Sequence, residues 1–388
     1  MRITGIRAAT VPLNIEMSNA AFSFRGMSTT IVAVLTDRVA EGRPVTGFAF
    51  NSTGRYACTA TIEGRIAPRL MDAEPGDLLD PATGLVDPAR AAAVMATGEK
   101  PGGDLERSMA IGTVEVALWD AVAKVRGQPL HHLLADAYGR PPPPDRMFCY
   151  VGGGWYRDGQ TPADLCAEMD RYLDAGYRLV KTKVGGRPLD EDRRRVDALL
   201  AHLDGRAGLA VDANGALSPD RARTYAEAFR GLGLRWFEEP VHPLDYAATA
   251  EFGALYGDPV ATGENLFSRQ DLMNLQRFGG LRPHRDLIQT DVPQSYGYDA
   301  TARAVRMLEA EGWSAASILP HGGNQMSLAA ALGLGMGMCE SYPDVFGVFS
   351  GYADGAALID GCLPAPTAPG IGFERQARLY GLFRDLAN

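Results

Sequence analysis

Five polar residues recur along the second half of the chain at nearly constant intervals, each directly after a short apolar run. They are Asp212, Glu238, Glu264, Asp291 and His321, and the successive spacings are 26, 26, 27 and 30 residues. A helix-like segment follows each of them. Strands and helices alternating at this interval predict a parallel (β/α) barrel, whose active site lies at the carboxyl ends of the strands. The sequence therefore predicts that separate segments of the chain place these residues around one site.

Two lysines, Lys181 and Lys183, precede these residues in the apolar run 178–184. Residues two apart on a strand point to the same face, so both are predicted to enter the mouth of the barrel. Because like charges repel, one ammonium is expected to lose its proton more easily than a free lysine, as a general base requires. The alternative is that the lysines form ion pairs with the acids.

Three of the acids, Asp212, Glu238 and Glu264, end successive predicted strands. Mg²⁺ prefers oxygen ligands and is commonly bound by carboxylates together with water and substrate oxygens. Three carboxylates in register at one face therefore predict a magnesium site. The alternative is that each acid only caps the amino terminus of the following helix.

Asp291 and His321 end the next two predicted strands, so a carboxylate and an imidazole are expected in contact. Such a carboxylate orients the ring and raises its basicity, which predicts a catalytic dyad rather than a structural histidine. Glu340 is either an acid that donates a hydrogen bond to an enolate oxygen or a plain loop acid. A metal ion flanked by lysine on one side and this dyad on the other predicts removal of a proton next to a carboxylate.

The composition limits the remaining classes of function. The chain has 388 residues, 46% of them hydrophobic and 22% charged, which fits a globular protein of two domains, one of barrel size. The net charge is −9 and no Lys/Arg cluster occurs, so neither nucleic acid nor an anionic membrane is expected as a partner. Five scattered cysteines and no apolar segment of signal-peptide or membrane-spanning length favour a soluble, cytoplasmic protein.

The first part of the chain lacks the barrel rhythm and predicts an α+β domain over residues 1–144. Strands are expected at Ile3–Leu13, Thr29–Asp37 and Val45–Phe50, and helices at Ile62–Leu70, Pro88–Ala96 and Ser108–Val125. The polar and aromatic loop Asn14–Met27 is interpreted as a surface segment or lid. Four prolines at 141–144 mark the boundary to a barrel over 145–355. Its eighth strand, in 332–339, is weak, and residues 356–388 are expected to return to the first domain.

These residues together resemble the mandelate racemase subgroup of the enolase superfamily, over essentially the whole chain. Within it, several stretches are most similar to the D-tartrate dehydratase family: Phe50–Tyr56, Glu99–Gly103, Gly263–Ser268, Pro320–Leu328 and Pro369–Glu374. The resemblance implies a modified (β/α)7β barrel with an α+β capping domain from both termini. It also implies Mg²⁺, a small hydroxy-diacid substrate and removal of an α-proton; a homo-oligomer is expected.

The resemblance further implies a role for each residue. Lys183 would take the proton from C2, Lys181 would stabilise the carboxylate, and His321, held by Asp291, would protonate the departing C3 hydroxyl. Lys100 and Asn51 would hold the distal carboxylate and a hydroxyl. One departure is Val241-His242 after the second acid, which leaves the diacid open, as does Trp155 after the first strand. Two alternatives remain: a racemase or epimerase that uses the same two bases, and a barrel that only binds sugar acids.

Overall fold

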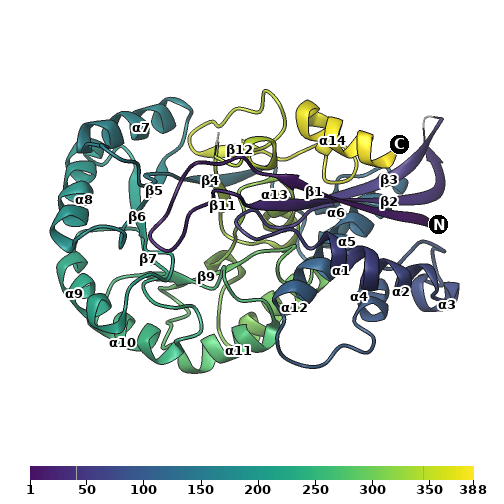
Figure 1. The fold of residues 1–388 in the computed structure, drawn as a ribbon, viewed down its shortest axis with the longest axis horizontal. Coiled ribbons are helices and arrows are strands. Elements are labelled where there is room, and N and C mark those ends of the chain that lie inside the picture. Colours follow the sequence, from purple (N-terminus) through teal and green to yellow (C-terminus); the bar gives the residue numbers. More distant parts are fainter. Residues whose placement is uncertain (41, 344) are drawn as a thin grey trace.

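The computed structural model describes residues 1–40, 42–343 and 345–388. Its amino-terminal part is a three-stranded antiparallel sheet in the order β1-β2-β3, with strands β1 (Ile3–Pro12), β2 (Ser28–Ala40) and β3 (Arg43–Phe50) (Figure 1). The three predicted strands are confirmed. The central strand β2 is buried from Thr29 to Val34 because β1 and β3 flank it and helix α5 covers one face.

Helices follow this sheet and complete the capping domain. They are α1 (Thr59–Thr61), a π-helical turn (Ile62–Ile66), α2 (Ala67–Met71), α3 (Pro75–Leu78), α4 (Pro88–Met95), α5 (Leu105–Val125) and α6 (Leu130–Ala137). The long helix α5 is buried on nearly every side, as its apolar sequence predicts. It packs so closely on β3 that a side chain at Gly47 would overlap the Ala117 carbonyl.

Helix α5 also fixes the capping domain to the barrel. Glu115 accepts hydrogen bonds from the backbone N–H groups of Tyr298 and Asp299, at 2.8 and 2.9 Å, where helix α12 (Tyr298–Ala310) begins. Gly112 lies against the Pro293 carbonyl, which leaves no room for a Cβ. Both contacts hold the segment that directly follows Asp291, so the capping domain helps to place a predicted site residue.

The second part of the chain is a parallel barrel with strand order β10-β9-β8-β7-β6-β5-β4-β11. Seven strands are each followed by a helix: β4 (Arg146–Gly152), α7 (Pro162–Asp174), β5 (Leu179–Lys183), α8 (Leu189–Leu203), β6 (Gly208–Asp212), α9 (Pro219–Phe229), β7 (Phe237–Glu238), α10 (Tyr246–Tyr256), β8 (Val260–Thr262), α11 (Arg269–Phe278), β9 (Leu287–Thr290), α12 (Tyr298–Ala310), β10 (Ile318–Pro320) and α13 (Gln325–Leu334). An eighth strand, β11 (Cys339–Ser341), lacks such a helix and pairs in parallel with β4. The predicted (β/α)7β barrel is therefore confirmed.

The weak eighth strand has a simple local explanation. Helix α13 extends to Leu334, so only the end of the expected segment 332–339 enters a strand. That strand is three residues long and includes the charged Glu340, so it gives almost no apolar pattern. Pairing of Cys339 with Cys149 and of Ser341 with Val151 defines it.

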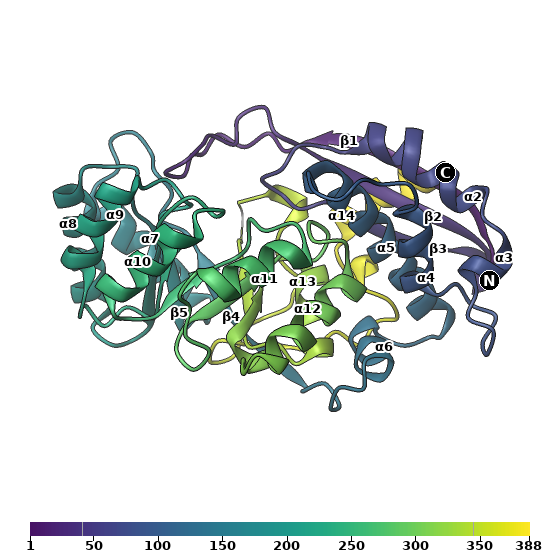
Figure 2. The same cartoon turned by 90° about the horizontal axis from the view of Figure 1, so that it is seen from below.

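The carboxyl-terminal segment passes from the barrel to the capping domain. Strand β12 (Cys362–Pro364) first pairs antiparallel with β4, so residues 356–388 do not all lie on the capping domain. Beyond it, the Ile371 N–H donates to the buried Asp120 carboxylate at 2.7 Å. Helix α14 (Ala377–Ala387) then lies along the sheet, where Phe383 stacks on Phe48 with ring centroids 4.9 Å apart (Figures 1 and 2). The expected return of the chain to the first domain is therefore made by this helix. Short 3₁₀ turns lie at Ala315–Ser317, Gly347–Phe349 and Phe373–Arg375.

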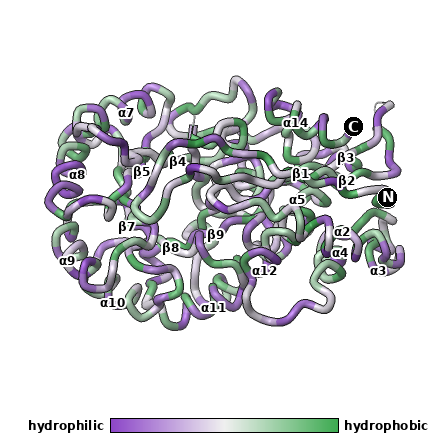
Figure 3. The backbone as a smooth tube through the Cα atoms, in the orientation of Figure 1, coloured by the Kyte–Doolittle hydropathy of each residue, from purple (hydrophilic) through white to green (hydrophobic). Residues whose placement is uncertain are grey.

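The loop 14–27 leaves the capping sheet and extends over the barrel, as the purple segment in Figure 1 shows. Its Ser18 forms an isolated bridge with Tyr156, directly after the first barrel strand. The loop interpreted as a lid thus lies on the barrel. Hydrophilic residues recur along the outer helices α8, α9 and α11 (Figure 3). Within the described ranges, no helix is both long and apolar enough to cross a membrane.

Candidate active site

Lys181 and Lys183 lie on β5 and enter the interior of the barrel together, as predicted. Both contact Oδ2 of Asp212 on the neighbouring strand β6, Lys183 Nζ at 2.5 Å and Lys181 Nζ at 3.6 Å. The parallel register pairs Lys183 directly with Asp212, so the contact follows from the sheet. Neither lysine is more than 2% exposed.

The Lys181 ammonium lies among several carboxylates. Its Nζ forms an ion pair with Glu238 Oε1 and lies 2.6 Å from Glu340 Oε1. Burial lowers the pKa of Lys181, but Glu238 and Glu340 outweigh burial and hold that pKa well above its usual value. Lys181 is therefore not the lysine that loses its proton more easily, and the expectation that one of the two does so stays a prediction. The alternative, ion pairs with the acids, holds for both lysines.

The three candidate metal ligands lie at the carboxyl ends of neighbouring strands, with Asp212 ending β6, Glu238 ending β7 and Glu264 following β8. Asp212 and Glu238 pair across the sheet. The alternative reading of these acids as helix caps is wrong, because other side chains bind the first backbone N–H groups of the following helices. The observed caps are Ser218 for α9, Asp245 for α10 and Ser268 for α11.

The chemistry of these carboxylates fits a hard divalent cation. In the described part of the chain, no group of three acidic, histidine or cysteine side chains is arranged to hold a metal ion. The two lysines bind oxygens of Asp212 and Glu238. Burial raises the pKa of Glu238 well above its usual value; Lys181 opposes this shift, while Asp212 and Glu264 add to it. Glu264 Oε2 is buried and accepts no hydrogen bond from the described residues. Crowded, incompletely neutralised carboxylates of this kind favour a bound cation.

The ligand assignment predicts the effect of Glu238→Gln on metal binding. Replacing a charged ligand oxygen by a weaker amide oxygen is expected to weaken Mg²⁺ binding. Mutation of residues that only support a metal ligand typically lowers affinity by about 10- to 100-fold, so loss of the ligand charge should cost at least as much. Isothermal titration of the purified protein with MgCl₂ measures this. Glu251→Gln on the outside of α10, where Glu251 pairs with Arg223, is the matched control. Equal Mg²⁺ affinity in the wild type and Glu238→Gln would remove Glu238 from the ligand set.

Asp291 and His321 are in contact, as predicted from their positions after adjacent strands. His321 Nδ1 lies 2.8 Å from Asp291 Oδ2, so Nε2 is the ring nitrogen left to act, 3.6 Å from Glu264 Oε2. Burial lowers the pKa of His321, but Glu264 and the hydrogen bond to Asp291 raise it more, to about 10. These surroundings favour the protonated imidazole, which can deliver a proton from Nε2.

A residue of the capping domain completes the dyad, and sequence reasoning missed it. Ser52, just after β3, donates a hydrogen bond from Oγ to Asp291 Oδ2 at 2.6 Å. The backbone N–H of Gln294 binds the other oxygen, Oδ1, at 3.1 Å. Asp291 is thus held by both domains. No local signal could have identified Ser52, because the contact spans 239 residues of sequence.

Glu340 is neither exposed nor in a loop, since it is fully buried on β11. Its Oε1 pairs with Lys181 at 2.6 Å and accepts the Tyr342 hydroxyl at 2.7 Å. Burial by itself raises the pKa of Glu340, but the positive charges of Lys181 and His321 outweigh burial and hold that pKa below its usual value. The carboxylate form is therefore favoured. A carboxylate accepts hydrogen bonds, which favours a role in holding Lys181. The predicted donation to an enolate oxygen stays a prediction.

A cavity at this face of the barrel brings together Lys183, Glu264 and His321. The capping domain contributes Asn19, Phe22, Phe24, Ser52, Thr53, Gly54 and Arg55 to its wall, and the barrel contributes Trp155, Asn214, Asn265, Gln294, Tyr342 and Phe346. The Trp155 ring lies over Lys183, with Nζ 4.4 Å from the ring centroid. Phe24 of the lid loop packs edge-on against the same ring at 5.3 Å. Aromatic rings thus separate Lys183 from bulk water, and Trp155 belongs to the site.

Asn51, Lys100 and His242 were considered from the sequence, and none of them lines this cavity or contacts the lysines and acids beneath it. Asn51 is buried at the end of β3, where its Oδ1 accepts from Thr29 Oγ1 at 2.7 Å and its Nδ2 donates to the Tyr56 carbonyl at 3.2 Å. It therefore shapes the loop that carries Ser52 and Arg55. Lys100 and His242 are exposed, and neither is among the residues that line the cavity.

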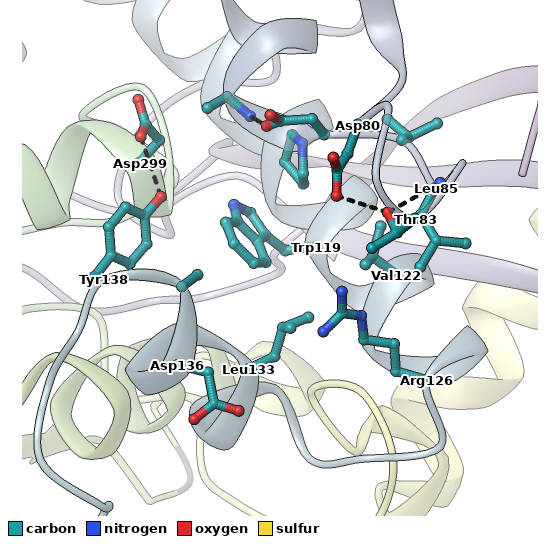
Figure 4. Close-up of a pocket in the computed structure, with 15 residues that line it drawn as sticks. Asp80, Thr83, Leu85, Trp119, Val122, Arg126, Leu133, Asp136, Tyr138 and Asp299 are labelled. Atoms are coloured by element: carbon teal, nitrogen blue, oxygen red, sulfur yellow. Dashed lines mark hydrogen bonds between the residues drawn. The ribbon is translucent and has the colours of Figure 1, made fainter.

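A different cavity, of about 430 Å³, lies between the capping helices α4, α5 and α6 and the start of α12 (Figure 4). Its wall includes Trp119, Val122 and Leu133, and the Tyr138 hydroxyl donates to Asp299 Oδ1 at 3.1 Å on one side. None of the residues predicted for catalysis or metal binding lines it. The barrel mouth, with its cations and carboxylates, is therefore the candidate active site.

A capped (β/α)7β barrel with two lysines, strand-end acids and a histidine–aspartate pair defines an enolase-type protein. Residues 164–378 match the family described as "Enolase C-terminal domain-like", and residues 6–135 match the "Mandelate racemase / muconate lactonizing enzyme, N-terminal domain". The chain belongs to this mandelate racemase and muconate lactonizing enzyme family of the enolase superfamily.

The relatives of the chain include cycloisomerases, dehydratases and an epimerase. A 3,6-anhydro-alpha-L-galactonate cycloisomerase of Streptomyces coelicolor is 34% identical over 70% of this chain and 72% of its own. An L-talarate/galactarate dehydratase of Salmonella typhimurium is 31% identical over 48% of this chain and 44% of its own. An arabinonate dehydratase of Saccharolobus solfataricus is 25% identical over 54% and 53%. The chain thus spans only about half the length of the two dehydratases.

Solved structures agree with the fold. A racemase from Streptomyces coelicolor with bound magnesium has a TM-score of 0.76 at 26% identity, covering 96% of this chain and 98% of its own. A mandelate racemase/muconate lactonizing enzyme-like protein from Rubrobacter xylanophilus has a TM-score of 0.75, also at 26% identity, with 98% and 99% covered.

Proposed function

We propose that the chain is a Mg²⁺-dependent dehydratase of a hydroxy-diacid, with D-tartrate, converted to oxaloacetate, as the first candidate. One observation carries the proposal: Lys183 and the Asp291-held His321 line one cavity, and Glu264 lies in the same wall. A base and an acid facing one small space suit the removal of a proton from one carbon and a hydroxyl from the next.

The protein's own residues perform two proton transfers in this proposal. Lys183 takes the proton from C2, and the rings of Trp155 and Phe24 keep bulk water away from its Nζ. His321 then protonates the C3 hydroxyl from Nε2, so that it leaves as water while Asp291 retains the ring orientation. The resulting enol takes a proton at C3 and loses the proton of its C2 hydroxyl, which gives the keto acid. Lys183 then releases its extra proton to solvent and His321 regains one, so the protons balance over a turnover.

Asp212, Glu238 and Glu264 would hold the magnesium ion. When bound, it supplies positive charge beside the carboxylate next to C2, where negative charge accumulates as the proton leaves. Lys181, fixed by Glu238 and Glu340, adds a second positive charge on this side of the site. Magnesium in the solved racemase and sugar-acid chemistry in the relatives support this assignment. The choice of D-tartrate rests on the sequence stretches at Phe50–Tyr56, Gly263–Ser268 and Pro320–Leu328.

The experiment is a survey of keto-acid release with Mg²⁺ present. The acids are D-, L- and meso-tartrate beside C5 and C6 mono- and diacids, each repeated with EDTA. We expect metal-dependent oxaloacetate from D-tartrate and not from the other two stereoisomers. Turnover of another diacid would correct the substrate and keep the reaction. Absence of keto acid from every member of the survey would overturn the proposal.

The second candidate is an isomerase, and the 34% identity to a cycloisomerase is the observation that favours it. The same Lys183 and His321 can remove a proton and return one at the α-carbon of a hydroxy acid. Solvent deuterium at that carbon, without any keto acid, would indicate a racemase or epimerase; ring opening of an anhydro sugar acid would indicate a cycloisomerase. The homo-oligomeric state and cytoplasmic location stay predictions from the sequence.

A further inference from the structure

The loop that follows β3 carries a guanidinium group into the wall of the active-site cavity. Arg55 is half-buried there, on the side of the cavity formed by the capping domain. Its sequence neighbour Ser52 binds Asp291 of the barrel, so the loop is fixed at the cavity and not free to leave it. Arg55 was not predicted as a site residue.

Two barrel residues orient the Arg55 side chain. Its Nε donates to Gln294 Oε1 at 3.0 Å, and its guanidinium carbon lies 5.3 Å from the centre of the Phe267 ring. Gln294 is itself held, because its Nε2 donates to the backbone carbonyl of Glu264. Since Nε is occupied, the two terminal nitrogens form the free end of the guanidinium, and no described residue forms an ion pair with them.

The other cations of the cavity wall are already neutralised. Lys183 pairs with Asp212 at 2.5 Å, and His321 pairs with Asp291 at 2.8 Å. Among the described residues that line the cavity, Arg55 is the cation that forms no ion pair with a carboxylate. Burial raises the pKa of Glu239 and the charge of Arg55 opposes that shift, but both oxygens of Glu239 accept hydrogen bonds from Asn265 Nδ2 instead. A guanidinium with two free terminal nitrogens in a fixed plane matches the geometry of a carboxylate and binds it through two hydrogen bonds.

We propose that Arg55 binds the second carboxylate of a dicarboxylic substrate, positioned by Gln294 and Phe267. The inference rests on the proposed function for the first carboxylate, which is assigned to the side of the site with Asp212, Glu238 and Glu264. It replaces Lys100, which is not among the residues of the cavity wall, as the group that distinguishes diacids from monoacids. A contrasting role is purely structural, with Arg55 only linking the capping domain to the barrel through Gln294.

Binding of unreactive C4 acids separates these roles without any need for turnover. Dissociation constants of succinate and butyrate are measured by calorimetry with saturating Mg²⁺, at constant ionic strength, for the wild type and Arg55→Met. We expect the wild type to bind succinate more tightly than butyrate. Arg55→Met should bind succinate about 10- to 100-fold more weakly than the wild type, the change typical of losing a hydrogen-bonded pair of charged groups. Butyrate affinity should change by less than about threefold. Arg269→Met, at the exposed start of α11, is the control.

Two further variants distinguish loss of the positive charge from loss of structure. Arg55→Lys keeps the charge and should retain part of the preference for succinate, whereas Arg55→Gln should lose it as Arg55→Met does. Thermal unfolding of each variant shows whether the capping domain remains docked. Equal losses for succinate and butyrate, unchanged binding of both acids, or a wild type without preference for succinate would each overturn the inference.

Failure of this inference is distinguishable from failure of the proposed function. If succinate affinity depends on Arg55 but no hydroxy acid is dehydrated, the reaction assignment is wrong and the binding role of Arg55 holds. If a diacid is dehydrated at the wild-type kcat/KM by Arg55→Met, the reaction assignment holds and the role of Arg55 is wrong.

Discussion

Replacement of Lys183 by methionine is expected to lower kcat by about 10² to 10⁴-fold, the contribution typical of a general base. The physical reason is the position of Nζ in the cavity wall, beneath Trp155 and away from bulk water, where no solvent base replaces it easily. The measurement is the initial rate of keto-acid release with the best substrate of the survey. Circular dichroism and Mg²⁺ titration of the same preparation confirm that fold and metal binding persist.

Lys183→Arg is the matched variant for this experiment. It retains a cation to pair with Asp212 but cannot be neutral near neutral pH, because the guanidinium pKa is above 12. We expect Lys183→Arg to be as inactive as Lys183→Met, which would show that a neutral amine is needed as well as a charge partner. Turnover within tenfold of the wild type in either variant would exclude Lys183 as the base.

His321→Asn is expected to separate the two proton transfers. Without an imidazole near the C3 hydroxyl, keto-acid release should fall by about 10² to 10⁴-fold. Lys183 is unchanged, so the α-proton should still exchange slowly with solvent. Incubation in deuterium oxide, followed by proton NMR of the recovered substrate, measures this exchange beside the rate of keto-acid release.

The control for His321→Asn is His132→Asn, since His132 is exposed on α6. It should keep both the exchange and the dehydration of the wild type. Loss of both reactions in His321→Asn would mean that His321, rather than Lys183, removes the α-proton. Undiminished dehydration would exclude His321 from either transfer.

The barrel was predictable because its information is local and repeated. Each strand is a short apolar run, and each ends on a polar residue that the parallel arrangement brings to one face. Strand β9 ends at Thr290, directly before Asp291, and strand β8 ends at Thr262, two residues before Glu264. The contact of Asp291 with His321 follows in the same way, because their strands are neighbours.

The use of lysine rather than arginine at positions 181 and 183 is also visible in the sequence. Only four of the 38 lysine and arginine residues are lysines, and two of them are Lys181 and Lys183. A chain that otherwise uses arginine keeps lysine where a group must be able to lose its proton or approach a carboxylate as a compact charge. The raised pKa of Lys181 could not be predicted from the sequence, because it comes from Glu238 and Glu340, which lie on other strands.

The sequence by itself thus determined the order of the strands, the acids, lysines and histidine at their ends, and the class of reaction that those groups suit. Only the tertiary structure decided which capping-domain residues meet them. Ser52 and Arg55 each contact a barrel residue 239 positions away, Asp291 and Gln294 respectively. Such contacts depend on how two separately folded surfaces dock, here through α5 with Glu115 and Gly112. Periodicity within a segment reports which face of that segment is buried, but not which residue of a distant domain covers it.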